Sequence, residues 1–177
     1  MQKNTFPKVF LDKLFYLDCY SIERFSKTKL GQLLLDAKQS QNKQLIKELE
    51  LEIKPKIQAI IEKYNIQAVG FIPPTVRREI QFMKELQKSL HLLLPVIGII
   101  KAKTEIAVPQ KSLSKLDDRV ENAARTIFLQ ETRSFKNILL IDDAVGSGAT
   151  LNETAKKIKY QKICSGNLIG LAITGSF

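Results

Sequence analysis

The chain has 177 residues, 44% of them hydrophobic and 26% charged, which suits one domain with a substantial core. Its net charge of +10 attracts phosphorylated ligands or nucleic acid, although lysines interspersed with glutamates are also typical of an ordinary solvated surface. One histidine and two distant cysteines exclude a zinc site, and no apolar run is long enough for a membrane span or a signal peptide, so we expect a cytoplasmic protein.

The first half of the chain predicts short strands followed by helices. The aromatic and aliphatic residues of 9–25 favour short strands or a hairpin, and residues 30–38 and 42–53 have helical periodicity. Pro55 is a favourable first residue for a separate helix, which we expect to end near Tyr64. A strand at 67–72 follows and ends at a Pro-Pro pair.

The second half alternates helices and strands. We expect helices at 78–92, 116–124 and 150–160, strands at 95–100, 126–129, 138–141 and 167–174, and a polar loop at 101–116. His91 ends a helix and is expected to be a structural or surface residue. The pattern predicts an α/β fold with a mostly parallel, twisted sheet flanked by helices on both faces. Ligands of such sheets bind beyond the carboxyl ends of the strands.

Residues 138–150 carry the clearest functional signal, Ile-Leu-Leu-Ile-Asp-Asp-Ala-Val-Gly-Ser-Gly-Ala-Thr. Four aliphatic residues suit a buried strand, and two acids follow. Carboxylates accept hydrogen bonds from sugar hydroxyls or hold Mg²⁺, whereas a small-residue loop at a helix start favours an anion. The run therefore predicts a site for a phosphorylated sugar.

Competing motifs fit this run less well. A Walker-type phosphate loop needs a Lys after its last glycine, and a Rossmann fingerprint needs a glycine where this chain has Leu151. An ordinary strand that ends in a polar turn explains an Asp-Asp pair, but it does not explain all thirteen positions in order.

The run resembles the phosphoribosyl-diphosphate (PRPP) signature of type I phosphoribosyltransferases. That resemblance implies that Asp142 and Asp143 hold the ribose hydroxyls and act as the catalytic pair, and that the loop binds the 5′-phosphate. The implied PRPP-binding residues are Asp142, Asp143, Ala144, Val145, Gly146, Ser147, Gly148, Ala149 and Thr150. Two features depart from the family: Gly146 replaces the usual Thr or Ser, and the loop lacks the acid that serves many members as a general base.

Further strand ends extend the resemblance. The Pro-Pro turn stands where the family places a diphosphate-binding loop, although a plain strand stop explains it equally well. Candidates for diphosphate binding are Pro73, Pro74, Arg77, Arg78, Lys101, Lys103 and Arg119.

The chain is also similar to the ComF-type, competence-associated branch of the family, without the four-cysteine zinc finger with which many of its members begin. The residues that carry this likeness are Lys38, Arg77, Arg78, Gln81, Lys103, Thr104, Gln110, Leu113, Ser114, Arg119, Asn122 and Phe128.

The resemblance implies a single type I phosphoribosyltransferase-like domain over 1–177, with a small hood from 1–30 and 101–119. Such a protein binds PRPP with Mg²⁺, carried mainly by the substrate, and transfers the phosphoribosyl group to a base or amine with release of diphosphate. The acceptor is not readable from the sequence, and a homodimer is possible. The alternative is a non-catalytic protein that binds PRPP, a nucleotide or single-stranded DNA and is linked to DNA uptake. Unrelated chemistry on a Rossmann-like sheet is a third, weaker possibility.

Overall fold

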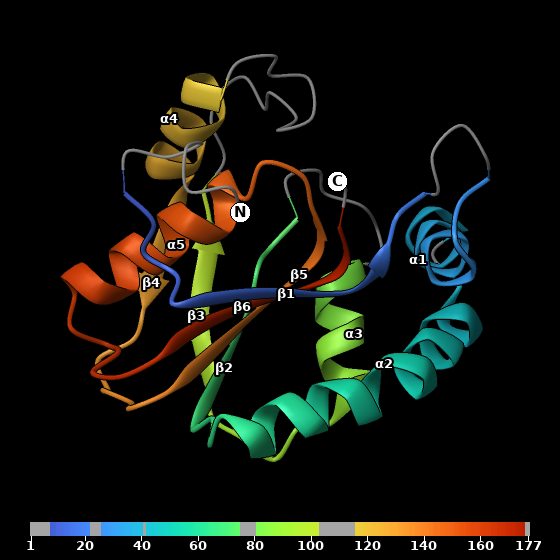
Figure 1. Cartoon of the computed structure of the whole chain (residues 1–177), viewed down its shortest axis with the longest axis horizontal. Coiled ribbons are helices and arrows are strands. Elements are labelled where there is room, and N and C mark those ends of the chain that lie inside the picture. Colours follow the sequence, from blue (N-terminus) through green and yellow to red (C-terminus); the bar gives the residue numbers. More distant parts are fainter. Residues whose placement is uncertain (1–7, 22–25, 41, 75–80, 103–115, 176–177) are drawn as a thin grey trace.

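The computed structural model describes residues 8–21, 26–40, 42–74, 81–102 and 116–175 (Figure 1). Its centre is a six-stranded sheet in the order β1-β6-β5-β2-β3-β4. The strands are β1 (Lys13–Cys19), β2 (Ala68–Phe71), β3 (Val96–Lys101), β4 (Ile127–Gln130), β5 (Ile138–Val145) and β6 (Leu168–Gly175). All neighbours are parallel except β3 and β4. The predicted α/β class with a mostly parallel sheet is confirmed.

Within the described ranges, five helices surround the sheet: α1 (Lys29–Ser40), α2 (Lys43–Lys63), α3 (Phe82–Leu90), α4 (Leu116–Thr126) and α5 (Ala149–Tyr160). One face of the sheet packs against α1, α2 and α3, and the other packs against α5, which in turn contacts α4 (Figure 1). Each face has its own hydrophobic core, because side chains along a strand alternate between the two faces.

The prediction that Pro55 starts a new helix was wrong, because α2 runs unbroken through it. Proline removes one helical hydrogen bond, but Pro55 lies on the exposed side of the helix. Ile53 and Ile57, on either side of it, are fully buried and continue the apolar stripe. Their burial offsets the lost hydrogen bond, since each fully buried Ile contributes roughly 1.5–3 kcal/mol.

In the segment expected to form short strands or a hairpin, the described residues contain one strand, β1, which pairs in parallel with β6 from the far end of the chain. Antiparallel pairing among its described residues is limited to a single bridge between Ser21 and Lys27. The parallel partner explains why the local pattern misleads: β1 completes the sheet through contacts that are distant in sequence.

Strand β5 is longer than the predicted 138–141 and includes both acids. Its ladder with β6 continues from Asp142, opposite Ala172, to Val145, opposite Gly175. Leu139 packs in the core with α1, α2 and α3, and Leu140 in the core with α5. Asp142 lies opposite Ala172, which packs in the core with α5, whereas the next residue of β6, Ile173, packs in the core with α1, α2 and α3. Asp142 therefore belongs to the α5 face and Asp143 to the α1 face.

Candidate functional site

The two acids lie at the topological switch point of the sheet. From β2 the chain passes through α3 to β3 on one side, whereas β5 lies on the other side of β2. The carboxyl ends of β2 and β5 therefore border the crevice in which open α/β sheets bind ligands. The N–H of Ile72 donates to the carbonyl of Ile141 (2.9 Å), which keeps the chain after β2 alongside β5 up to the acids.

Each acid is bonded in a different way. The backbone N–H of Asp143 donates to Oδ1 of Asp142 (2.8 Å). Oδ2 of Asp143 accepts a hydrogen bond and ion pair from the ammonium of Lys38, which comes from α1. Within the described part of the chain, Oδ2 of Asp142 and Oδ1 of Asp143 have no hydrogen-bond partner. Both acids thus keep an acceptor oxygen for a ligand.

Lys101, the last residue of β3, supplies a second cation. Ile97 and Ile99 of the same strand pack in the α5-side core, so alternation places Lys101 on the same face as Asp142. Burial lowers the pKa of Lys101, and the charges of Asp142 and then Asp143 oppose that shift. The structure thus brings this predicted diphosphate-binding residue within electrostatic reach of both acids.

The pKa of Asp142 is raised to about 7. Burial is the largest cause and the neighbouring charge of Asp143 the second, while the N–H of Asp143 and the ammonium groups of Lys38 and Lys101 lower the pKa. The side chain therefore keeps its proton to a higher pH than an ordinary aspartic acid does. A carboxyl group in such a state favours a hydrogen-bond donor or a cation that stabilises its charge.

The loop after β5 leads directly into α5. Gly148 has φ 80°, in the left-handed region, and α5 begins at Ala149. The first N–H groups of a helix have no intrahelical acceptor, so this end is suited to an anion. The helix itself is firmly seated: the predicted face of Leu151, Thr154, Ala155 and Ile158 is buried.

The remaining predicted residues are placed less centrally. Pro73 and Pro74 follow β2 after Ile72 and are half-buried. Arg119 is half-buried in α4 and is not among the bonded partners of Asp142 or Asp143. Arg77, Arg78 and Lys103 lie outside the described residues, as do Thr104, Gln110, Leu113 and Ser114.

Lys38 is the site residue that sequence reasoning missed. Its only sequence signal is the ComF-type likeness, yet its ammonium contacts a signature acid that is 105 residues away. Nothing in its spacing distinguishes it from the other cations among 28 Lys and Arg. The packing of α1 against the sheet is what brings it to the site.

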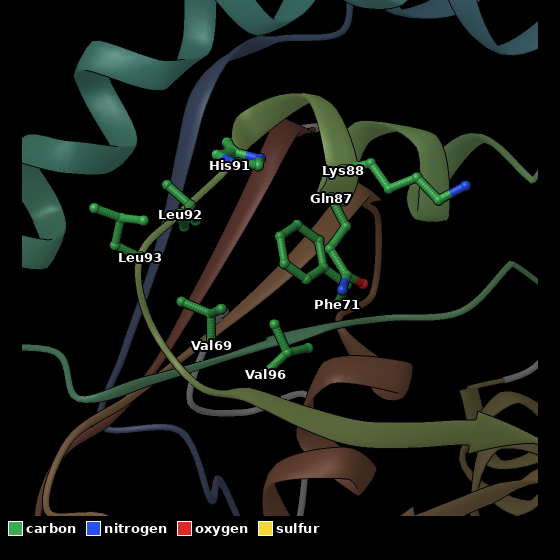
Figure 2. A pocket seen from close by; sticks show the side chains of 8 residues that line it. All are labelled: Val69, Phe71, Gln87, Lys88, His91, Leu92, Leu93 and Val96. Carbon is green, nitrogen blue, oxygen red and sulfur yellow. The ribbon is translucent and has the colours of Figure 1, made fainter.

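Three further observations do not extend this site. No group of three or more His, Cys, Asp or Glu that could hold a metal ion occurs in the described ranges. A hollow of about 180 Å³ lies beside α3, with none of the candidate residues around it. Figure 2 shows its lining of Val69, Phe71, Gln87, Lys88, His91, Leu92, Leu93 and Val96, with Lys88 extending away from the apolar side chains. No helix among the described residues is long and apolar enough to cross a membrane.

The chain matches no protein-family model and no curated protein sequence. Among solved structures, it is similar to a hypoxanthine phosphoribosyltransferase from Staphylococcus aureus, with 16% identity and a TM-score of 0.41 over 73% of this chain and 62% of that one. A hypoxanthine-guanine phosphoribosyltransferase from Bacillus anthracis gives 13% identity and a TM-score of 0.38 over 73% and 65%. The chain thus spans less than two thirds of the length of either protein. At this level the likeness carries no argument about activity, so the function is inferred from the site itself.

Proposed function

We propose that the chain binds PRPP as its Mg²⁺ complex and transfers the phosphoribosyl group to a base or amine, with release of diphosphate. The observation that carries this proposal is the arrangement at the carboxyl end of β5. Two adjacent carboxylates, each with an oxygen lacking a hydrogen-bond partner among the described residues, precede a glycine turn and the start of α5.

The proposed binding mode follows from this arrangement. Asp142 and Asp143 accept hydrogen bonds from the 2′ and 3′ hydroxyls of the ribose. Residues 146–150 hold the 5′-phosphate through backbone N–H groups at the start of α5, assisted by the hydroxyls of Ser147 and Thr150. The two ends of the substrate are then fixed, which orients the anomeric carbon for reaction.

In the proposed reaction, the bond between the anomeric carbon and the diphosphate oxygen breaks, and its electron pair leaves with the diphosphate. A lone pair of the acceptor nitrogen forms the new bond, and the proton that this nitrogen gives up passes to solvent, because residues 146–150 contain no acid to accept it. Positive charge develops on the ribose, where Asp142 and Asp143 stabilise it. Lys101 is positioned to stabilise the leaving diphosphate, and Pro73, Pro74, Arg77, Arg78, Lys103 and Arg119 complete the proposed set. Mg²⁺ arrives with the substrate and neutralises part of the diphosphate charge.

A second candidate is a protein that binds PRPP, a nucleotide or single-stranded DNA without turnover, as the ComF-type likeness suggests. The observation that favours it is the loop itself, because residues 146–150 contain no acid to act as a general base, and Gly146 supplies no hydroxyl. A link to DNA uptake belongs to this candidate, and the net charge of +10 suits it.

One assay separates the two candidates. The protein is incubated with Mg²⁺, PRPP and a panel of bases and amines, diphosphate release is followed, and a variant carrying Asp142→Asn and Asp143→Asn is the control. We expect release at least about 100-fold above that control, because charge stabilisation in the transition state contributes that much or more. A rise in melting temperature with PRPP but without release would favour the second candidate.

The absence of both release and stabilisation by PRPP would rule out a PRPP site. For the DNA alternative, binding of a single-stranded oligonucleotide is measured against salt concentration. Affinity that does not fall with added salt would contradict a phosphate-dominated contact.

A further inference from the structure

We infer that Lys38 is a positioning residue of the proposed PRPP site: its ammonium holds the Asp143 carboxylate by Oδ2, so that Oδ1 is directed to a ribose hydroxyl. This inference deepens the proposed function and rests on it. It assigns α1 a part in substrate binding that neither the signature nor the diphosphate-binding candidates contain.

The position of Lys38 is set by well-packed neighbours. Leu34, one turn earlier on the same side of α1, is 2% exposed, and Ala37 is 1% exposed. At the other end of the helix, a Cβ on Gly31 would clash with the carbonyl oxygen of Tyr20, so α1 approaches this backbone closely. The helix is therefore seated rigidly enough for Lys38 to reach one defined carboxylate oxygen.

The contact is specific to Asp143 because the two acids belong to opposite faces of the sheet. Lys38 approaches from the α1 face, to which Asp143 belongs, while Lys101 lies on the α5 face with Asp142. Of the two acids, Lys38 thus bonds Asp143, although the charges of both lysines also act on Asp142. Loss of Lys38 removes a positive charge where a polyanionic substrate must bind, and it frees the Asp143 carboxylate to rotate.

An opposite role for Lys38 is conceivable, in which the ammonium blocks the acid and the ribose must displace it. The geometry favours positioning, because the ammonium bonds Oδ2 and leaves Oδ1 without a hydrogen-bond partner among the residues that the structure describes. A ribose hydroxyl can then bind without breaking the ion pair. The two roles predict opposite changes in affinity when the lysine is removed.

The chain offers a matched control in the ion pair between Lys54 and Glu50 on α2. Its N–O distance is 3.0 Å, and its side chains are 31% and 10% exposed, against 31% and 15% for Lys38 and Asp143. Substitution of either lysine by methionine thus removes the cation of a partly buried ion pair. They differ in that Glu50 lies outside the proposed site.

The test compares the full chain with Lys38→Met, Lys38→Arg and Lys54→Met, using calorimetric titration with Mg²⁺ and PRPP and melting of the ligand-free proteins. We expect Lys38→Met to weaken PRPP binding about tenfold. This is the lower end of the usual loss when a hydrogen bond to a charged group is removed, because Lys38 is partly exposed to solvent. Lys38→Arg should restore most of the affinity, and Lys54→Met should leave it unchanged. Both methionine variants should lower the melting temperature by similar small amounts.

Unchanged or tighter binding by Lys38→Met, with wild-type binding intact, would overturn the positioning role and leave the proposed function standing. Equal weakening by Lys54→Met would overturn it as well, because the effect would then be a general one on stability. If the wild-type chain itself fails to bind Mg²⁺ and PRPP, the proposed function fails, and this inference fails with it.

Discussion

The two ends of β5 carry polar residues that differ in how fully their hydrogen-bonding groups are satisfied within the protein. At the amino end, the side-chain amide of Asn137 donates to the carbonyl oxygens of Tyr64 (3.0 Å) and Asn65 (3.2 Å), and its oxygen accepts from the N–H of Asn167 (3.0 Å). Every hydrogen-bonding group of this 6%-exposed side chain is used within the protein. Such a residue ties the end of α2 to the strand and to the loop before β6.

At the carboxyl end, two like charges are adjacent and only part of their bonding capacity is used. Asp142 is partly buried beside Asp143, and its pKa is raised to about 7. Residues in this condition lower the stability of the free protein and are typical of sites that bind or react with a ligand. The difference shows how one strand separates a structural end from a functional end.

The largest expected effect on stability is at the amino end. Asn137→Ala leaves two carbonyl groups, and both the backbone N–H and the side-chain amide of Asn167, without their partner, so we expect the free energy of unfolding to fall by about 3 kcal/mol. Urea denaturation measures this. PRPP affinity of the folded fraction should not change, since the site lies at the other end of the strand.

The control for that substitution is Asn42→Ala, which removes the exposed cap of α2, where Oδ1 accepts from the N–H of Gln44 (2.8 Å). We expect a smaller loss of about 1 kcal/mol. A comparable loss from both variants, or loss of PRPP binding by Asn137→Ala alone, would contradict the division between the two ends.

A smaller effect of opposite sign is expected at the carboxyl end, where Asp142→Asn should stabilise the ligand-free protein. The pKa of Asp142 is about 7 in the folded chain, against an ordinary value of 3.8. A raised folded-state pKa means that stability is fully present below pH 4 and is lost as the pH rises through 7. Asparagine does not ionise, so Asp142→Asn does not lose stability in this way. At pH 8 we expect its free energy of unfolding to be about 2 kcal/mol higher than that of the unsubstituted chain, which is less than the full pKa shift implies because the two acids are coupled.

Urea denaturation of both proteins at pH 4 and pH 8 checks the sign. The gain should be much smaller at pH 4, where the acid is neutral in the folded chain and only about half ionised in the unfolded chain, and PRPP binding should weaken at every pH. A gain of equal size at pH 4 would show that the effect does not come from the charge of Asp142.

Most of the fold could be predicted from the sequence, because its helices and buried strands have clear periodicity. The errors occur where distant contacts override local signals. Pro55 signals a helix start, but the buried Ile53 and Ile57 carry the helix through it. Strand β1 carries no local sign that its partner is β6, and the antiparallel strand β4 was expected without its direction.

In the candidate site, too, local sequence patterns predict some features, whereas others depend on contacts that are distant in sequence. The acids and the loop after β5 are consecutive in the chain, so their pattern is visible in the sequence. The approach of Lys101 to the acids depends on the order of β5, β2 and β3, which the alternation of strands and helices predicts in outline. Lys38 could not be predicted, because its contact depends on how α1 lies across the sheet.

The smallest expected effect tests the backbone geometry of the carboxyl end. Gly148 has φ 80°, where a side chain is strained, so Gly148→Ala should lower the free energy of unfolding by about 1 kcal/mol. Gly146→Ala is the matched control: Gly146 is exposed and lies outside the left-handed region, so a change within about 0.5 kcal/mol is expected. Gly148→Ala should also weaken PRPP binding. The backbone has to shift to relieve the strain of an alanine at this φ, and that shift displaces the first N–H groups of α5. Equal stability of the two variants, or PRPP binding by Gly148→Ala as tight as that of the unsubstituted chain, would show that the turn at Gly148 does not set the geometry of the proposed phosphate loop.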